Sequence, residues 1–201
     1  DHIYLDNLST QNRYKLIIRN ANQKVIDTRD FRSLDLEKKE VHFAIASCMD
    51  DRLASAIQKK MWTSFIKQEA DLHFFIGDNV YGDVGVLKKG LAKPQELWRR
   101  YAETRNSLEI FKAKKLTPTL AIWDDHDYGV NDGGKEYPKR AESRDLLLDF
   151  LKVSKSRSVW DRAGAYQSYT FGETNKKVNI ILLDARYFRD PVERRQGQNP
   201  Q

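Results

Sequence analysis

Hydrophobic and polar residues alternate in two short runs near the start of the chain, residues 14–19 and 24–31. A period of two is typical of a β-strand with one covered face. The four residues between the runs, NANQ, favour a turn. The pattern therefore predicts a β-hairpin in this part of the chain.

The residues around this hairpin indicate the kind of β-domain to which it belongs. Leu5, Leu8 and Tyr14 follow one another in an order that resembles the tyrosine corner, which precedes a late strand of an immunoglobulin or fibronectin sandwich. Because two strands alone are unstable, further strands are needed. Residues 1–35 are therefore predicted to be the remnant of a small amino-terminal fibronectin- or immunoglobulin-like β-domain.

The pattern changes after a charged linker at residues 33–40. Short apolar runs then alternate with segments in which apolar residues recur at the helical period of 3.6. The predicted strands are 41–48, 71–78, 117–125, 165–172 and 177–186, and the predicted helices are 53–70, 94–111 and 141–152. Strands and helices that alternate in this way predict an α/β fold, whose near-continuous apolar strands are buried on both faces.

Composition narrows the class of protein. With 40% apolar and 32% charged residues among 201, the chain has the make-up of a soluble globular protein of one or two domains. No apolar run reaches the roughly 18–20 residues of a membrane-spanning helix. The amino terminus shows no signal peptide, as expected of a chain already cut or of an internal segment. The single cysteine, Cys48, excludes an internal disulfide framework.

The net charge of +6 is spread along the chain, without a block of five or more basic residues. No nucleic-acid-binding arm is therefore predicted, and no specific nucleic-acid partner. The positive balance would steer anionic substrates weakly toward the protein. An ordinary basic surface is the simpler explanation of the same charge.

Three of the predicted strands end in groups that bind metals or phosphate in other proteins. Cys48 follows the first of these strands, Asp78 follows the second, and the acidic sequence DDH at 124–126 follows the third. The carboxyl ends of strands in an open α/β sheet meet at the crevice where ligands bind. We therefore predict a metal or phosphate site at this edge of the sheet.

Each of these groups also has a simpler interpretation. Asp78 and Tyr81 offer a carboxylate and a phenolate, which suit a hard cation such as ferric iron, but Gly-Asp-Asn is also common turn chemistry. A lone thiol such as Cys48 is usually an inert buried residue. Because Cys48 lies at a strand end beside the other donors, the two interpretations, an inert thiol and a metal ligand, are equally supported.

The acidic loop has two interpretations as well. Asp124, Asp125 and Asp127 repel one another unless a cation neutralises them, and the alternative is a solvated acidic loop. His126 lies among these acids and is expected to be protonated, which suits phosphate binding or proton donation to a leaving oxygen.

A further buried strand is predicted to end at Asp184 and Arg186. The default interpretation of this pair is a salt bridge. The alternative is that Arg186 lies near an oxyanion, because the guanidinium group binds phosphate and carboxylate through paired hydrogen bonds.

From residue 41 onward the motifs resemble those of one family, the PhoD-like alkaline phosphatases and phosphodiesterases. The family's order and spacing are found in "IASC", "FFIGDNVYGD", "WDDHDYGVNDGG", "ESRDLLLDFL", "GAYQSYTFG" and "ILLDARYFRD". The resemblance implies a calcineurin-like metallophosphoesterase fold, a four-layer αββα sandwich, of which residues 41–201 would be the amino-terminal part. It also implies a secreted or periplasmic location.

The resemblance implies a hydrolase that cleaves phosphate mono- or diesters with a metal-bound hydroxide at a dinuclear site. The implied metals are ferric iron and calcium, with other divalent metals as substitutes. By motif, Cys48 and Tyr81 would bind iron, Asp78 would bridge the two metals, and Asp125 would bind the second one.

The same motifs imply residues that act on the substrate. His126 falls on the motif histidine that contacts the phosphate, so His126 and Asp78 are the predicted catalytic residues. Asp124 and Asn131 are nearby donors and are predicted to bind substrate together with His126. The implied substrate is a phosphate ester, with a phospholipid or a nucleotide among the candidates.

The family's metal site also needs histidines and acids from a carboxyl-terminal half. His2 and His42 precede the first motif and His73 lies within a predicted strand, so only His126 is placed for chemistry. A second polypeptide piece is therefore predicted to complete the site, as after nicking of the polar loop at 191–201. Two alternatives stay open: a non-catalytic binding module, and a metal-dependent nuclease, which would need basic side chains massed around the site.

Overall fold

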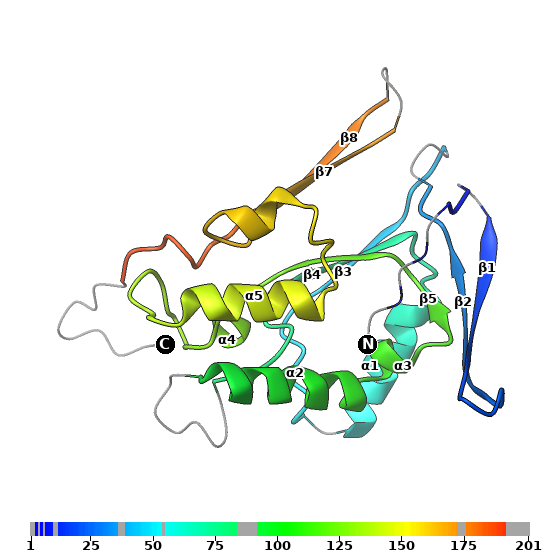
Figure 1. The fold of residues 1–201 in the computed structure, drawn as a ribbon, viewed down its shortest axis with the longest axis horizontal. Coiled ribbons are helices and arrows are strands. Elements are labelled where there is room, and N and C mark those ends of the chain that lie inside the picture. Colours follow the sequence, from blue (N-terminus) through cyan, green and yellow to red (C-terminus); the bar gives the residue numbers. More distant parts are fainter. Residues whose placement is uncertain are drawn as a thin grey trace.

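The computed structural model of the chain describes residues 3, 5, 7–9, 12–35, 39–53, 55–83, 92–172 and 176–191. Its strands are β1 (Arg13–Arg19), β2 (Val25–Arg32), β3 (Phe43–Ala46), β4 (Leu72–Ile76), β5 (Lys115–Leu116), β6 (Thr119–Ile122), β7 (Gln167–Phe171) and β8 (Val178–Leu182). Its helices are α1 (Ser55–Lys67), α2 (Pro94–Ser107), α3 (Glu109–Lys112), α4 (Asp125–Tyr128), α5 (Arg140–Phe150) and the 3-10 helix η1 (Ser158–Asp161). The predicted hairpin and the predicted alternation of strands and helices are both confirmed (Figure 1).

Two predicted boundaries differ from the observed ones. The helix expected at 94–111 is divided, because Leu108 adopts an extended conformation between α2 and α3. The strand expected at 117–125 is also shorter, since it ends at Ile122 and Asp125 already belongs to α4. The acidic side chains therefore lie on a short helix directly after the strand.

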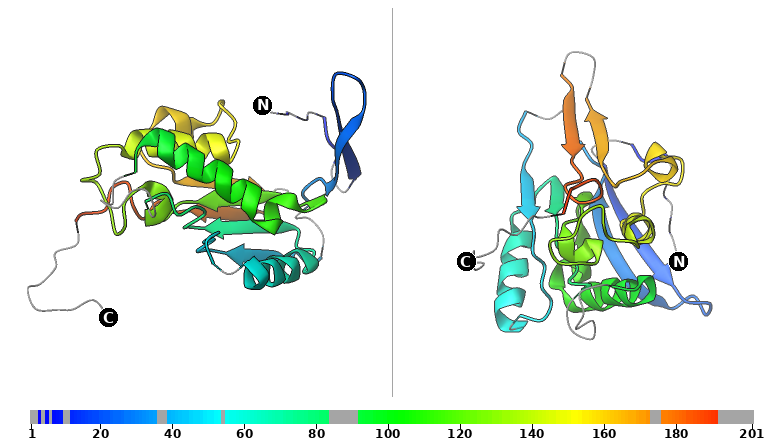
Figure 2. Two further views of the ribbon diagram at one scale, coloured as in Figure 1. Left: turned by 90° about the horizontal axis from the view of Figure 1, so that it is seen from below. Right: turned by 90° about the vertical axis from the view of Figure 1, so that its left-hand side faces the viewer.

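The centre of the fold is a parallel sheet with the strand order β3-β4-β6. Helices α2 and α5 lie on one face of this sheet, and α1 lies on the other (Figures 1 and 2). Successive residues of β4 serve the two faces: Phe74 packs in the core with Leu97 of α2, and Phe75 packs with Trp62 of α1. Burial on both sides explains why β4 is continuously apolar.

The amino-terminal hairpin is joined to the rest of the chain. β1 and β2 pair in antiparallel fashion, and β2 also pairs with β5, where Phe31 lies opposite Leu116 in a parallel register. Tyr14 stacks on Phe31, and its hydroxyl group donates to the Ser9 carbonyl oxygen at 3.2 Å and accepts from the Ser9 N–H at 2.7 Å. This is the contact expected of a tyrosine corner. A separate domain over residues 1–35 stays a prediction.

The last two strands form a two-stranded antiparallel sheet of their own, β7-β8. The sequence predicted that the strand leading to Asp184 is buried, and this prediction is wrong for the described residues. Ile181 and Leu183 are 61% and 74% exposed. Their apolar character therefore does not come from a core within the described part of the chain.

The parallel sheet has a similar uncovered strip. Phe43 and Ile45 of β3 are 45% and 61% exposed, and Ile76 at the end of β4 is 51% exposed. Ile45 pairs with Phe74, so these residues extend the same sheet face that α2 and α5 cover further along. None of the described helices is long and apolar enough to cross a membrane.

His73 is a buried histidine on the α1 face of β4. Its ring lies 4.8 Å from the ring of Phe65 and 6.2 Å from that of Phe75, measured between centroids. Burial lowers the pKa of His73 from 6.5 to about 4, because the aromatic surroundings do not solvate a charged ring. The position of His73 in the core agrees with its place inside a predicted strand.

Replacement of His73 by phenylalanine is expected to make the fold more resistant to acid. The wild-type imidazole protonates more easily in the unfolded chain than in the folded one, so unfolding free energy is lost as the pH falls from 6.5 to 4. After allowance for solvent screening, the loss is about 2 kcal/mol. Urea unfolding at both ends of this pH range measures it. Identical pH dependence of the variant and the wild type would contradict the prediction.

Candidate metal centre

Cys48 and Asp78 follow neighbouring parallel strands, and both have a left-handed backbone conformation, with φ of +54° and +51°. Residues with a side chain adopt this conformation at a cost, and such strain is concentrated at functional sites. Two backbone hydrogen bonds hold the loops together. The Cys48 N–H donates to the carbonyl oxygen of Gly77 at 3.2 Å, and the Met49 N–H donates to the backbone carbonyl oxygen of Asp78 at 2.8 Å. The ends of β3 and β4 are therefore fixed side by side.

A buried carboxylate fixes the end of β6 against the end of β4. Asp127 accepts the backbone N–H of Asn79 at 3.0 Å, the side-chain amide of Asn79 at 2.5 Å, and the N–H of Asp124 at 2.6 Å. Gly77, with φ of +118°, allows the close approach, since a Cβ there would lie 2.5 Å from the Cβ of Asp124. Complete burial raises the pKa of Asp127. Asp127 therefore clamps two loops together.

Metal-type donors meet at this edge of the sheet. Asp78, Asp125 and His126 each place one ligand atom within 4.8 Å of the others. The Cys48 Sγ lies 3.6 Å from Asp78 Oδ2, and the backbone N–H of His126 donates to Asp78 Oδ1 at 3.3 Å. The structure thus brings together a thiol, two carboxyl groups and an imidazole that the sequence places up to 78 positions apart.

Tyr81 completes this group. Its ring lies 4.2 Å from the ring of His126, and its hydroxyl group interacts with the Cys48 thiol. Burial raises the pKa of Tyr81 well above its usual value, and the nearby Asp78 and Cys48 raise it further. The Arg52 guanidinium, 5.2 Å from the ring centre, does not reverse this effect. Phenolate ligation by Tyr81 therefore requires the positive charge of a bound cation.

The pKa values of the two carboxyl groups of the donor set, Asp78 and Asp125, are shifted in opposite directions. Burial raises the pKa of Asp78, and the neighbouring Asp125 adds to this effect against the attraction of His126. Burial also opposes ionisation of Asp125, but the N–H of Asp132, which donates to it at 2.7 Å, and the charge of Arg186 lower its pKa overall. A cation between them would remove the repulsion that raises the pKa of Asp78.

Asp83 is a site residue to which the sequence assigned no role. Its carboxyl group lies 2.7 Å from Nδ1 of His126 and is almost completely buried. Burial raises the pKa of Asp83, while the hydrogen bond from His126 lowers it. A carboxylate on one ring nitrogen fixes the orientation of the imidazole and leaves the other nitrogen for chemistry. The signal was present in the sequence, since Asp83 follows Asp78 in the same loop.

Arg186 does not form the predicted salt bridge with Asp184. Its Nε donates to Asp124 instead, and its Nη2 lies 3.8 Å from Asp125 Oδ1. Asp184 accepts the backbone N–H of Arg186 at 2.9 Å, so the carboxylate holds the chain and leaves the guanidinium free to reach the acidic loop. Nη1 of Arg186 is buried and has no hydrogen-bond partner among the described residues.

The two remaining predicted site residues lie at the margin of the centre. Asp124 is paired with Arg186, so its carboxylate is already neutralised. Asn131 is exposed, and its amide donates to Asp132 at 2.9 Å. Asp132 in turn donates its backbone N–H to Asp125. Direct substrate binding by Asp124 and Asn131 stays a prediction.

Comparison with known proteins concerns the fold. No family model and no curated protein matches the sequence. A solved structure described as "Structure of PhoD" is similar in fold, with a TM-score of 0.63 and 21% sequence identity over 90% of this chain. The chain therefore has a PhoD-like fold, as its motifs predicted. It spans 38% of the length of that solved chain.

Proposed function

We propose that the protein hydrolyses phosphate mono- or diesters with the help of two bound metal ions, as a PhoD-like phosphatase or phosphodiesterase. The observation that carries the proposal is the convergence of thiol, carboxyl, phenol and imidazole groups where the strands of a PhoD-like fold end. Perturbed acids gathered at one strand edge are a mark of catalytic sites.

The donor set fits the proposed metals. Cys48 and Tyr81 would bind ferric iron, Asp78 would be shared between the ions, and Asp125 would bind calcium or another divalent metal. The raised pKa values of Asp78 and Tyr81 support this assignment, because a cation stabilises the ionised form of each side chain. When bound, the ions would supply Lewis acidity and an activated water molecule.

The residues around the ions would act directly on the substrate. Asp83 holds Nδ1 of His126, so Nε2 is the nitrogen that would contact a phosphate oxygen or protonate the leaving oxygen. The guanidinium of Arg186, which lies at Asp124 and Asp125, would stabilise the negative charge that develops on the phosphoryl group. This role corresponds to the alternative interpretation of Arg186 from the sequence.

A further polypeptide segment is proposed to complete both the metal site and the fold. The exposed apolar residues Phe43, Ile45 and Ile76 on the sheet, and Ile181 and Leu183 beyond it, support this proposal. A second sheet packed on these side chains would produce the four-layer αββα sandwich and could bring further metal ligands. The location that we propose is secreted or periplasmic, and a phospholipid or a nucleotide is the proposed kind of substrate.

Metal-dependent hydrolysis tests the proposed function. The full protein, loaded with iron and calcium, is expected to cleave chromogenic phosphate mono- or diesters, and chelation should abolish the activity. Single- and double-stranded DNA serve as competing substrates, and preferential cleavage of DNA would support the nuclease alternative. A protein that contains both metals but cleaves none of these compounds would support a non-catalytic binding module.

Replacement of Tyr81 by phenylalanine is expected to remove any visible colour of the iron-loaded protein. The colour would come from charge transfer between the phenolate and ferric iron, and phenylalanine keeps the ring contact with His126 but lacks the oxygen. Absorption spectra of the two proteins at equal iron content measure the effect. An unchanged spectrum would remove Tyr81 from the set of ligands.

A further inference from the structure

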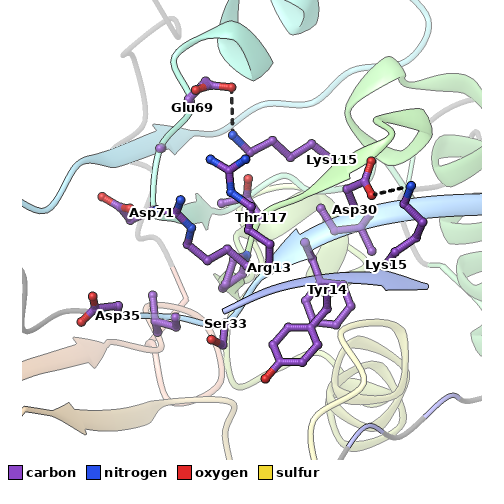
Figure 3. A pocket seen from close by; sticks show the side chains of 16 residues that line it. Arg13, Tyr14, Lys15, Asp30, Ser33, Asp35, Glu69, Asp71, Lys115 and Thr117 are labelled. Carbon is purple, nitrogen blue, oxygen red and sulfur yellow. Dashed lines mark hydrogen bonds and ion pairs between the residues drawn. The ribbon is translucent and has the colours of Figure 1, made fainter. Parts of the chain in front are cut away.

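A cavity of about 700 Å³ lies away from the candidate metal centre. It opens between the three-stranded sheet β1-β2-β5 and the segments that lead into β4 and β6, where Asp71 and Thr117 lie (Figure 3). The metal-type donors follow β4 and β6, whereas this cavity precedes them. Because the two strands are parallel, the cavity and the donor group lie at opposite ends of the central sheet.

The sheet wall of this cavity is strongly basic, as the strand register shows. Arg13 lies opposite Arg32, Lys15 lies opposite Asp30, and Asp30 in turn lies opposite Lys115 on the other side of β2. Directly opposed residues share one face of a sheet, and so do residues two positions apart on a strand. This face of the sheet therefore presents four cations and a single carboxylate to the cavity, and the other walls add the carboxyl groups of Asp35, Glu69 and Asp71.

The basic side chains are only partly neutralised. Lys15 and Asp30 form a loose, exposed pair at 3.9 Å, and Lys115 donates to Glu69 at 2.8 Å. Within the described part of the chain, the side chains of Arg13 and Arg32 form neither a hydrogen bond nor an ion pair with one another or with a neighbour. These two like charges face each other across the strands, which is unfavourable unless an anion lies between them.

Three of the cations, Lys115, Arg13 and Arg32, all influence the same carboxyl group, that of Glu69. Its pKa is lowered chiefly by the hydrogen bond from Lys115, and also by the charges of Arg13 and Arg32. Figure 3 shows the side chains of Arg13 and Lys115 reaching toward Glu69 across the cavity. Three cations thus surround one carboxylate. Asp71, on the same rim, already accepts the backbone N–H of His42 at 2.8 Å.

We propose that this cavity binds a phosphate-type dianion, held by Arg13, Arg32 and Lys115. Each guanidinium group offers forked donors that match two phosphate oxygens, and the ammonium group adds a point charge. The cavity has the volume of sites that hold drug-sized molecules, so the phosphate is either free or the end of a larger phosphorylated molecule. The site is independent of the proposed catalytic function.

Calorimetric titration with inorganic phosphate and with adenosine monophosphate tests the proposal. The titrations use the Asp78→Asn variant in buffer that contains a chelator, so that phosphate binding at the metal centre does not contribute to the measured heat. Arg13→Gln combined with Arg32→Gln is expected to weaken binding of either probe by about tenfold or more. Lys59→Gln combined with Lys60→Gln removes the same charge from exposed positions of α1 and should leave binding nearly unchanged.

Each outcome decides the question. Binding that weakens only in the arginine variant supports the site, and tighter binding of the nucleotide than of phosphate identifies the larger molecule as the preferred ligand. Absence of binding to the parent protein, or equal binding by both double variants, overturns the proposal. A thermal melt in phosphate-free buffer checks that the arginine variant is folded. If the double variant unfolds, Arg13→Gln and Arg32→Gln are tested as single substitutions, and binding that neither of them weakens overturns the proposal.

Discussion

Replacement of Asp78 by asparagine is expected to lower metal content and phosphate-ester hydrolysis by several orders of magnitude, while the metal-free protein becomes more stable. Burial and Asp125 raise the pKa of the Asp78 carboxyl group. An acid whose pKa is higher in the folded state than in the unfolded chain destabilises the fold once the pH exceeds its pKa in the unfolded chain. Asparagine removes this charge and also tolerates the left-handed backbone at φ +51°.

The combination of the two effects separates a metal ligand from a structural turn. If Asp78 served only the turn, asparagine would replace it with little change in metal content or turnover. Asp145→Asn, at an exposed carboxylate paired with Arg144, is the matched control and should change neither. Elemental analysis, initial rates and urea unfolding after chelation measure the three quantities. Wild-type-like turnover of Asp78→Asn would disprove the role of Asp78 as a shared ligand.

The donor cluster could be predicted because it follows from backbone topology. Cys48, Asp78 and Asp125 come after consecutive strands of one parallel sheet, and such strand ends meet whatever the side chains are. The continuous apolar sequence of β4 already indicated that the strand is central. The PhoD-like fold was predicted in a different way, from the resemblance of six motifs to those of a known family, and the similar solved structure agrees with it.

Side-chain partners were harder to predict, because several residues compete for each of them. The acids of the loop after β6 look equivalent in the sequence, yet Asp127 is a buried clamp, Asp124 pairs with Arg186, and Asp125 faces the donor group. Which carboxylate takes which partner depends on the first turn of α4, where rotation by one residue changes the direction of each side chain. Burial of β8 failed as a prediction for a different reason. An apolar strand shows that a cover is needed but not which segment provides it.

Replacement of Asp184 by alanine is expected to cost about 3–5 kcal/mol of unfolding free energy. Its Oδ1 accepts Trp123 Nε1 at 2.8 Å and the N–H groups of Arg186 and Tyr187 at 2.9 Å each. Its Oδ2 accepts the N–H of Ala165 at 2.7 Å. Alanine would leave these donors without a partner, and Trp123, Ala165 and Tyr187 are buried.

Two further substitutions show whether the lost hydrogen bonds cause this effect. Asp184→Asn keeps one acceptor oxygen and should lose less stability than alanine does. Asp190→Ala removes an exposed carboxylate paired with Lys135 and should change the unfolding free energy by less than about 1 kcal/mol. Asp184 anchors the backbone of Arg186, so its loss should also release the Arg186 guanidinium from Asp124. Urea unfolding measures the change in stability, and a metal titration measures whether the metal affinity changes with it. Equal stabilities for Asp184→Ala and Asp190→Ala would show that this carboxylate does not hold β8 to the metal centre.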